Sequence, residues 1–366
     1  LQQKYFASNF LILLMNYETE LDDIIMTLVK EKGSDLHLNV GNFPTIRVNR
    51  ELIPLTRKKE LTDSDTLGFL REMTEEKALT NFVITQEADF TYIHRNEYRL
   101  RVNASFQRGV ISLALRLVPT VRSLQELGLP EQLLHISRER QGFFVIVGSV
   151  GQGKSTTLAA MIEQINVESR RHILTIEDPI EFHFNQSKSI IEQREVGTDT
   201  NDFATALVHS LRQDVDVIMI GEMSEYETMS AAVTAAETGH LVLATVHSNS
   251  AAQAIDRIID TFPGGEQNQI RLQLASSLIG TLYQHLIPST AGGLVPIFEL
   301  LLNTGATANL IRESRTNELE TIIETGSDEG MIDLDRYLAS LVRKGVITRD
   351  IGFAYARRKA LFDRLL

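Results

Sequence analysis

The fold is decided by one stretch of the sequence, Gly148-Ser149-Val150-Gly151-Gln152-Gly153-Lys154-Ser155. It fits the pattern G-x-x-x-x-G-K-[ST], follows the apolar run from Phe143 to Val147 and precedes a helical segment that begins near Thr156. That order of strand, loop and helix is the setting in which the pattern binds nucleotide phosphates. An eight-position match in this setting rarely arises by chance, so the sequence predicts a nucleotide site here.

Each residue type in this loop has a physical role at a phosphate. The glycines let the backbone turn its N–H groups inward, which makes a nest for anions at the positive end of a helix. Lys154 is expected to reach the β- and γ-phosphates of ATP, and the Ser155 hydroxyl to complete the coordination of Mg²⁺. Residues 148–156 are therefore the predicted nucleotide-binding loop, with ATP and Mg²⁺ as its ligands.

Two further apolar runs end in carboxylates. Residues 173–176 run into Glu177 and Asp178, and residues 217–220 precede Glu222. Apolar runs without alternation are typical of strands buried on both faces of a parallel sheet, whose carboxyl ends meet at one edge. We expect Asp178 and Glu222 to help Ser155 hold Mg²⁺, and Glu177 and Glu222 to serve catalysis. A single carboxylate at a strand end could equally be a solvated side chain, but two together favour a site.

A third apolar run, residues 241–246, lies between two histidines. His240 precedes it and His247 follows it. Either residue alone could be an ordinary packed histidine. A His247 side chain hydrogen-bonded to the γ-phosphate or to Glu222 would instead report the state of the nucleotide. The nine histidines show no metal-ligand spacing, so Mg²⁺ is expected to be held mainly by phosphates and water.

The composition is that of an ordinary globular protein. The chain has 366 residues, which at about 150 residues per domain suggests two domains. It contains no cysteine, which excludes disulfides and thiolate metal sites and suits a reducing compartment. Lys+Arg 36 against Asp+Glu 48 gives a net charge of −12, which argues against nucleic acid as a partner. No apolar run approaches the roughly 20 residues that a bilayer helix needs.

Hydrophobic periodicity divides the chain into regions. Residues 1–14 are interpreted as an N-terminal extension before a natural start at Met15, residues 15–118 as a helix-then-sheet domain, and residues 119–135 as a linker. Residues 136–290 alternate buried strands with helices, as βαβ units do, and residues 291–366 are predicted to be a helical C-terminal region.

Individual elements follow from the same patterns. The spacing predicts a helix over 63–82, alternating strands over 88–94, 98–106 and 110–117, and helices over 267–285, 333–344 and 350–366. Arg101 and Arg116 project from the polar faces of two of these strands.

Several stretches resemble the motifs of one known family, the PilT-like type IV pilus retraction ATPases. They are Ile176 to Phe182, Gln193 to Val196, Val217 to Met223 and Ala235 to Leu241, which look like the Asp box, an adjoining segment, the Walker B motif and the His box of that family. Gly33 to Leu38 is similar to the opening of its N-terminal domain, and Asn309 to Glu313 to its C-terminal retraction motif. The likeness covers nearly all of the chain from about residue 19.

The resemblance implies an α/β fold with a RecA-like P-loop ATPase core, a PAS-like α+β N-terminal domain and a helical C-terminal region. It further implies a homo-hexameric Mg²⁺-dependent motor that binds ATP between its two domains and powers pilus retraction and twitching motility. Such a motor would work in the cytoplasm, peripherally at the cytoplasmic face of the inner membrane. Its partners would be an inner-membrane pilus platform protein and a paralogous retraction ATPase.

The resemblance also implies roles for single residues. Glu177 corresponds to the catalytic carboxylate, Glu222 to the Walker B acid, and His240 and His247 to residues that couple the nucleotide to domain movement. Arginines of the N-terminal domain reach the nucleotide in this family. Arg101 and Arg116 match that pattern best, with Arg108 a weaker candidate. An arginine aimed at the phosphoryl group would stabilise developing charge.

Two departures from the family pattern leave alternatives open. Ser224-Glu225 stands where the family usually has Arg-Asp, and Ala306-Thr307-Ala308 replaces the Ala-Ile-Arg that opens its retraction motif. The second departure resembles the auxiliary PilU-like branch more than the principal motor. A pilus assembly or secretion ATPase is a close rival, although such relatives commonly carry a four-cysteine zinc module that this chain cannot form. A nucleotide-controlled binding module with little hydrolysis is the alternative from another class.

Overall fold

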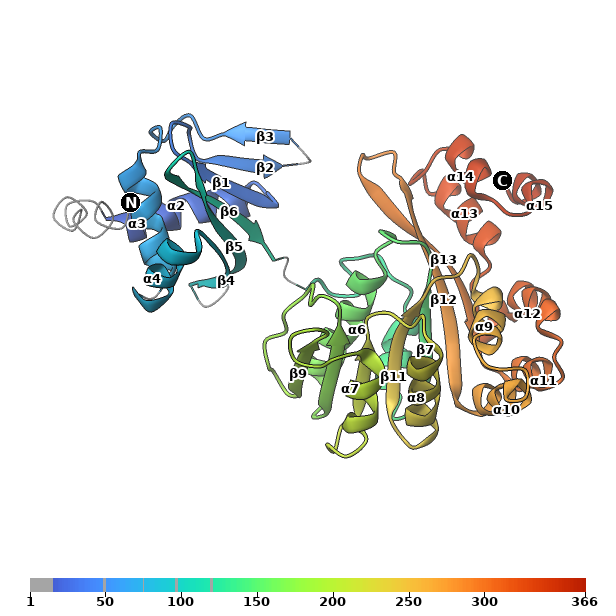
Figure 1. The fold of residues 1–366 in the computed structure, drawn as a ribbon. Helices are drawn as coiled ribbons and strands as arrows, with labels where there is room; N and C mark the ends of the chain where they lie inside the picture. Colours follow the sequence, from blue (N-terminus) through green and yellow to red (C-terminus); the bar gives the residue numbers. More distant parts are fainter. Residues whose placement is uncertain (1–15, 49–50, 75, 96–97, 119–120) are drawn as a thin grey trace. The chain divides into compact units, whose positions relative to one another are not determined.

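The computed structural model describes residues 16–48, 51–74, 76–95, 98–118 and 121–366, which form two compact units divided after Thr120 (Figure 1). The interpreted extension over residues 1–14 and the start at Met15 lie outside the described residues. Each unit has its own β-sheet and its own hydrophobic core.

The first unit is an antiparallel sheet in the strand order β3-β2-β1-β6-β5-β4. Its elements, in chain order, are α2 (Tyr17–Lys30), β1 (Asp35–Asn39), β2 (Thr45–Val48), β3 (Glu51–Pro54), α3 (Asp63–Met73), α4 (Glu76–Thr85), β4 (Glu87–His94), β5 (Tyr98–Gln107) and β6 (Val110–Leu117). The apolar stripe of α2, which includes Leu21, Ile24 and Leu28, packs on the alternating residues of β1, β5 and β6. This is the PAS-like α+β domain that the sequence predicts.

Two details of the first unit differ from the sequence prediction. The single helix expected over residues 63–82 is two helices, because Thr74 adopts an extended backbone (φ −133°, ψ 153°) that ends α3. Strands β2 and β3 were not predicted, since four-residue strands at a sheet edge leave too short a pattern to read.

Arg101 and Arg116 are direct neighbours in this sheet. They face each other in the register of β5 and β6, and both side chains are exposed. The Arg116 Nε donates to Asp35 Oδ1 on the next strand over a distance of 2.9 Å. The two predicted arginines therefore form one positive site on the polar face of the sheet.

The second unit is a seven-stranded sheet in the order β13-β12-β7-β11-β10-β8-β9, in which only the β12–β13 pair is antiparallel. Its strands are β7 (Gly142–Val147), β8 (His172–Glu177), β9 (Ile190–Glu195), β10 (Val217–Ile220), β11 (Leu241–Val246), β12 (Leu278–Pro288) and β13 (Leu294–Leu302). Its longer helices are α5 (Gln132–Arg138), α6 (Lys154–Glu168), α7 (Phe203–Ser210), α8 (Tyr226–Glu237), α9 (Ala251–Asp260) and α10 (Gln267–Ser277).

Helices cover both faces of this sheet, as in a RecA-like core. Within β7, Val145 and Val147 pack with α7 to α10, whereas Phe144 and Ile146 pack with α5 and α6. The buried strands therefore read as continuous apolar runs, as expected of a sheet buried on both faces. The arrangement brings the carboxyl ends of β7, β8, β10 and β11 to one edge.

The helix predicted over residues 267–285 is wrong. Helix α10 ends at Ser277, and the chain continues directly as strand β12. The four-residue spacing of Leu274, Leu278 and Leu282 fits a helix, but a bulge between Leu278 and Gly280 breaks the alternation that would have revealed the strand. Strand β9 was likewise not predicted.

The C-terminal region is also not wholly helical, because β13 forms the edge of the sheet. After it come α11 (Gly305–Arg312), α12 (Leu319–Thr325), α13 (Leu334–Arg343), α14 (Arg349–Tyr355) and α15 (Lys359–Leu365). The helix predicted over 350–366 is thus broken between Tyr355 and Lys359. Helices α13 to α15 pack against the β12–β13 hairpin around Ile287, Ile297 and Phe362. Among the described residues, no helix is both long and apolar enough to cross a bilayer.

Candidate active site

The predicted phosphate loop lies between the end of β7 and the first turn of α6. Lys154 is the first residue of α6, and its Nζ donates to the carbonyl oxygens of Gly148 and Ser149, each at 2.9 Å. The side chain is buried, and burial lowers the pKa of Lys154. The carboxylates of Glu222 and Glu181 act in the opposite direction and favour its charged form.

Glycine is required at Gly148 because the backbone there passes very close to β12. Its φ is +152°, and an added Cβ would lie 2.4 Å from the carbonyl oxygen of Gln284. Any side chain at this position would therefore push the loop away from the strand that supports it.

Gln284 on β12 supports the loop from behind. Its Oε1 accepts a hydrogen bond from the Thr157 hydroxyl at 2.7 Å, and its Nε2 donates to the carbonyl oxygen of Gln152 at 2.8 Å. The Gln152 side chain in turn accepts from the N–H of Leu286 at 2.7 Å. Gln284 is 2% exposed, so these contacts are shielded from water. Sequence reasoning did not identify Gln284, because its segment was expected to be helical.

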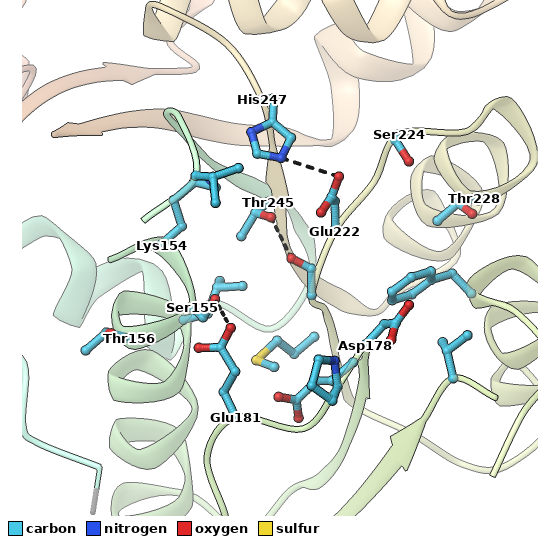
Figure 2. A pocket seen from close by; sticks show the side chains of 18 of the residues that line it. Lys154, Ser155, Thr156, Asp178, Glu181, Glu222, Ser224, Thr228, Thr245 and His247 are labelled. Atoms are coloured by element: carbon cyan, nitrogen blue, oxygen red, sulfur yellow. Dashed lines mark hydrogen bonds and ion pairs between the residues drawn. The ribbon is translucent and has the colours of Figure 1, made fainter. Parts of the chain in front are cut away.

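A cavity of about 750 Å³ opens in front of the loop. Lys154 and Ser155 border it from α6, and Glu222 and His247 border it from the ends of β10 and β11 (Figure 2). The Nε2 of His247 lies 3.4 Å from Glu222 Oε1, and its Nδ1 lies 3.2 Å from the carbonyl oxygen of Gly148. His247 thus connects the phosphate loop to the predicted Walker B carboxylate, as the sequence suggested.

Glu181 is a site residue that sequence reasoning did not single out. The Ser155 hydroxyl donates to Glu181 Oε1 at 3.3 Å, and Figure 2 shows the Glu181 side chain turned toward the start of α6. The residue lies within the stretch Ile176 to Phe182 that carries the family resemblance. Its position four residues beyond a strand end gave no reason to place it at the phosphate loop.

Glu177 has a different environment. It is 6% exposed, and its Oε1 accepts hydrogen bonds from the Thr175 hydroxyl at 2.7 Å and from Gln193 Nε2 at 3.3 Å. Burial raises the pKa of Glu177, and these hydrogen bonds only partly oppose that shift. Glu177 and Asp178 both line the cavity, but the Glu177 carboxylate is held by Thr175, Gln193 and the backbone of Glu181 rather than by the phosphate loop.

His240, which the sequence predicts among the nucleotide-binding residues, lies away from the phosphate loop of its own chain. His240 immediately precedes β11, at the amino edge of the sheet, where Leu241 pairs with Gly142. The phosphate loop lies beyond the opposite end of the same pair of strands, after Val147. The His240 Nδ1 contacts the carbonyl oxygen of Ala235, and the residue does not line the cavity.

The cavity wall is strongly acidic for a phosphate site. Six carboxylates line it, those of Glu177, Asp178, Glu181, Asp202, Glu222 and Glu225. Among the residues that the structure describes, Lys154 is the only lysine or arginine that lines it. Ser224, which replaces the family's usual arginine, also lines this wall. A nucleotide bound here therefore needs further positive charge.

A second cavity, of about 280 Å³, adjoins the first. Gly153, Thr156 and Leu286 border both cavities, and Leu127, Leu129 and Pro296 add apolar groups to the second wall. Arg122 and Glu126 add polar groups at this wall.

The model of one protein family, described as type II/IV secretion system protein, matches residues 16–325. The chain belongs to this family. The type IV pilus ATPase PilU of Pseudomonas aeruginosa is 39% identical over 92% of this chain and 88% of its own length. The type IV pilus retraction ATPase PilT of the same organism is also 39% identical, over 93% of this chain and 98% of its own.

A solved structure supports the same placement. The crystal structure of the pilus retraction motor PilT with bound ADP covers 94% of this chain and 98% of its own, at a TM-score of 0.78 and 36% sequence identity. The predicted RecA-like core, the PAS-like domain and the family resemblance are thus confirmed. As a member of this family, the chain is a P-loop ATPase of the PilT and PilU type.

Proposed function

We propose that this chain is a Mg²⁺-dependent ATPase motor that works as a homo-hexamer and powers retraction of type IV pili. The observation that carries the proposal is that Lys154, Ser155, Glu181, Glu222 and His247 meet at one cavity in front of the phosphate loop. Those groups suit phosphoryl transfer, whose catalysis consists mainly of positioning and charge stabilisation.

The residues present fit a magnesium ion. The Ser155 hydroxyl and the Glu181 carboxylate lie within hydrogen-bond distance, and Asp178 and Glu222 line the same cavity. Hydroxyl and carboxylate oxygens are the ligands that Mg²⁺ takes beside nucleotide phosphates. When bound, the ion would neutralise charge on the β- and γ-phosphate oxygens.

The proposed roles of the two neighbouring glutamates differ from the sequence prediction. Glu177 was expected to act on the attacking water, but its carboxylate is buried and held by Thr175 and Gln193. Its hydrogen bonds fit a role in shaping the loop that carries Asp178 and Glu181. Glu181 faces Ser155 and is the better candidate for orienting water at the γ-phosphate, together with Glu222. Lys154 would bind the γ-phosphoryl charge.

The missing positive charge supports a role for the N-terminal arginines. The cavity offers one lysine against six carboxylates, before any phosphate is added. Arg101 and Arg116 are exposed neighbours on the polar face of the first unit. We infer that they supply positive charge to the nucleotide in the assembled ring, which would also connect hydrolysis to domain movement. The smaller cavity, with its apolar wall, suits the base of the nucleotide.

The cellular role rests on the relatives. A cytoplasmic ring that pulls pilin subunits would work against an inner-membrane pilus platform protein, alone or beside a paralogous retraction ATPase. PilT and PilU match at the same 39% identity, so both the principal and the auxiliary role fit. The presence of Ser224 and Glu225 at the cavity favours slow turnover, which keeps a nucleotide-controlled binding module as the second candidate.

Replacement of Glu222 by Gln in the native host tests the direction of the motor. The proposal predicts cells that carry an excess of surface pili and have lost twitching. Bald cells would contradict retraction and favour an assembly ATPase. Normal piliation with normal twitching would contradict any motor role for this site.

A further inference from the structure

An ion pair between a buried glutamate and a partly exposed arginine joins the C-terminal helices to the edge of the sheet. Glu299 on β13 is 5% exposed, and its Oε2 accepts a hydrogen bond from the guanidinium of Arg357. Arg357 lies in the short link between α14 and α15, and its guanidinium stands 5.0 Å from the ring centre of Tyr283 on β12. Burial raises the pKa of Glu299, and the charge of Arg357 opposes that shift.

The same pair holds the loop that carries His247. The second terminal nitrogen of Arg357 donates to the carbonyl oxygen of Asn249 at 2.7 Å. The other oxygen of Glu299 accepts from the N–H of Ala251 at 2.8 Å, at the first turn of α9. Residues 249–251 are therefore fixed from the side of the C-terminal helices.

The other end of this loop is at the active site. His247, two residues before Asn249, contacts both Gly148 and Glu222. The segment of residues 247–251 thus runs from the phosphate loop to the pair formed by Arg357 and Glu299. Only Ser248 separates Asn249 from His247. A displacement of Asn249 is therefore passed on to His247 almost directly.

The neighbouring Arg358 provides a contrast within the same link. Its guanidinium pairs with Asp333, Asp335 and Glu324, which all lie in the C-terminal region. Within the described part of the chain, the ion pairs and hydrogen bonds of Arg358 do not reach residues 247–251. Arg358 therefore anchors the C-terminal helices, whereas Arg357 anchors them and also holds the segment of residues 247–251.

We propose that Arg357 is a positioning residue for the ATPase reaction and keeps His247 within contact distance of Glu222. Turnover then depends on the placement of helices α13 to α15. This inference deepens the proposed function and rests on it. Whatever binds or moves the C-terminal helices would then change hydrolysis through the guanidinium of Arg357, without touching the nucleotide.

Steady-state ATP hydrolysis by the full-length protein tests the proposal, with Arg358→Gln as the matched control. Arg357→Gln should lower kcat roughly tenfold or more, because small displacements of catalytic groups are costly, and should leave KM for ATP within about twofold. Arg358→Gln leaves the contacts of Arg357 to Glu299 and Asn249 in place, so its kcat should stay within about twofold of the wild type.

Two further variants keep the test decisive if Arg357→Gln unfolds. The double variant Glu299→Gln, Arg357→Gln leaves no uncompensated buried charge, so it should fold, and yet it lacks the contact to Asn249. Arg357→Lys keeps a positive charge opposite Glu299. The lysine ammonium lacks the planar guanidinium that donates to Glu299 and Asn249 at the same time. Both should fold stably and still show the lowered kcat, with Lys partly restoring the rate.

The outcomes separate this proposal from the proposed function. A double variant with wild-type kcat, or an Arg358→Gln variant that loses as much kcat as Arg357→Gln, would overturn the positioning role while the ATPase itself stands. A wild-type protein with no ATP hydrolysis would instead overturn the proposed function.

Discussion

Two nearby glutamates, Glu177 at the end of β8 and Glu181 in the loop after it, show how environment decides the role of a residue type. Glu181 faces the Ser155 hydroxyl, whereas Glu177 is buried between Thr175 and Gln193. We expect Glu181→Gln to lower kcat by about a hundredfold, because it removes a carboxylate that orients water. Glu177→Gln should lower it much less, since an amide can keep the accepting oxygen. Phosphate release measured for both variants checks this order, and the reverse order would return the catalytic role to Glu177.

The buried Glu177 also predicts a pH dependence of stability. Burial raises the pKa of Glu177, so the folded state holds its proton at pH values where the unfolded chain has released it. The stability that this group contributes is full below its unfolded pKa, about 4.3, and is lost as pH rises through the raised folded pKa.

The Gln variant provides the control for that dependence. The free energy of unfolding of Glu177→Gln, measured by urea denaturation, should fall less than that of the wild type as pH rises from about 4.5 to 7. Parallel curves for the two proteins over this range would contradict a raised pKa.

The motif identified some site residues and could not identify others. Lys154 and Ser155 follow from a local pattern whose chemistry is fixed by eight consecutive residues. Glu222 and His247 follow from strand ends that a parallel sheet brings together. Glu181 and Gln284 reach the phosphate loop only through tertiary packing, so no local pattern marks them. His240 precedes its strand, so strand polarity puts it at the opposite edge of the sheet from the phosphate loop of the same chain.

Strand β12 pairs with β7 and β13 in the sheet and also supports the phosphate loop from behind. Gln284 connects Thr157 to Gln152 in a buried position. Gln284→Ala leaves these two polar groups without their partner, which should cost about 1–3 kcal/mol in unfolding free energy. It should also weaken ATP binding, because the loop loses its support.

Nucleotide binding and thermal unfolding, measured on the same variant, check this expectation. Gln273→Ala is a suitable control, since Gln273 donates to Glu237 at an exposed position of α10. Unchanged nucleotide affinity in Gln284→Ala would show that β12 does not support the loop.

The elements differ in how well the sequence predicted them. The strands β7, β8, β10 and β11 were predicted because both of their faces are buried and their apolar runs are continuous. The β12–β13 hairpin was missed because its bulge breaks the alternation and its apolar spacing also fits a helix. Helix periodicity correctly predicted α13, where Leu334, Leu338 and Leu341 face the core, but not the break in the last helix at Arg357.

The chain as a whole carries its acidic nucleotide cavity and its exposed arginine pair on different units. If Arg101 supplies charge to the reacting phosphate, Arg101→Ala should lower kcat by about a thousandfold, the usual effect of such an arginine. Arg57→Ala, at an exposed turn of the same unit, is the matched control. Equal turnover in Arg101→Ala and wild type would show that the positive charge comes from elsewhere.

Phosphate release by the purified full-length protein with ATP and Mg²⁺, compared with a Lys154→Ala variant, tests the proposed hydrolytic site most directly. We predict that the wild type turns over at least about a hundredfold faster, because Lys154 stabilises the charge that develops on the γ-phosphoryl group. Equal rates for the two proteins would contradict ATP hydrolysis at this loop.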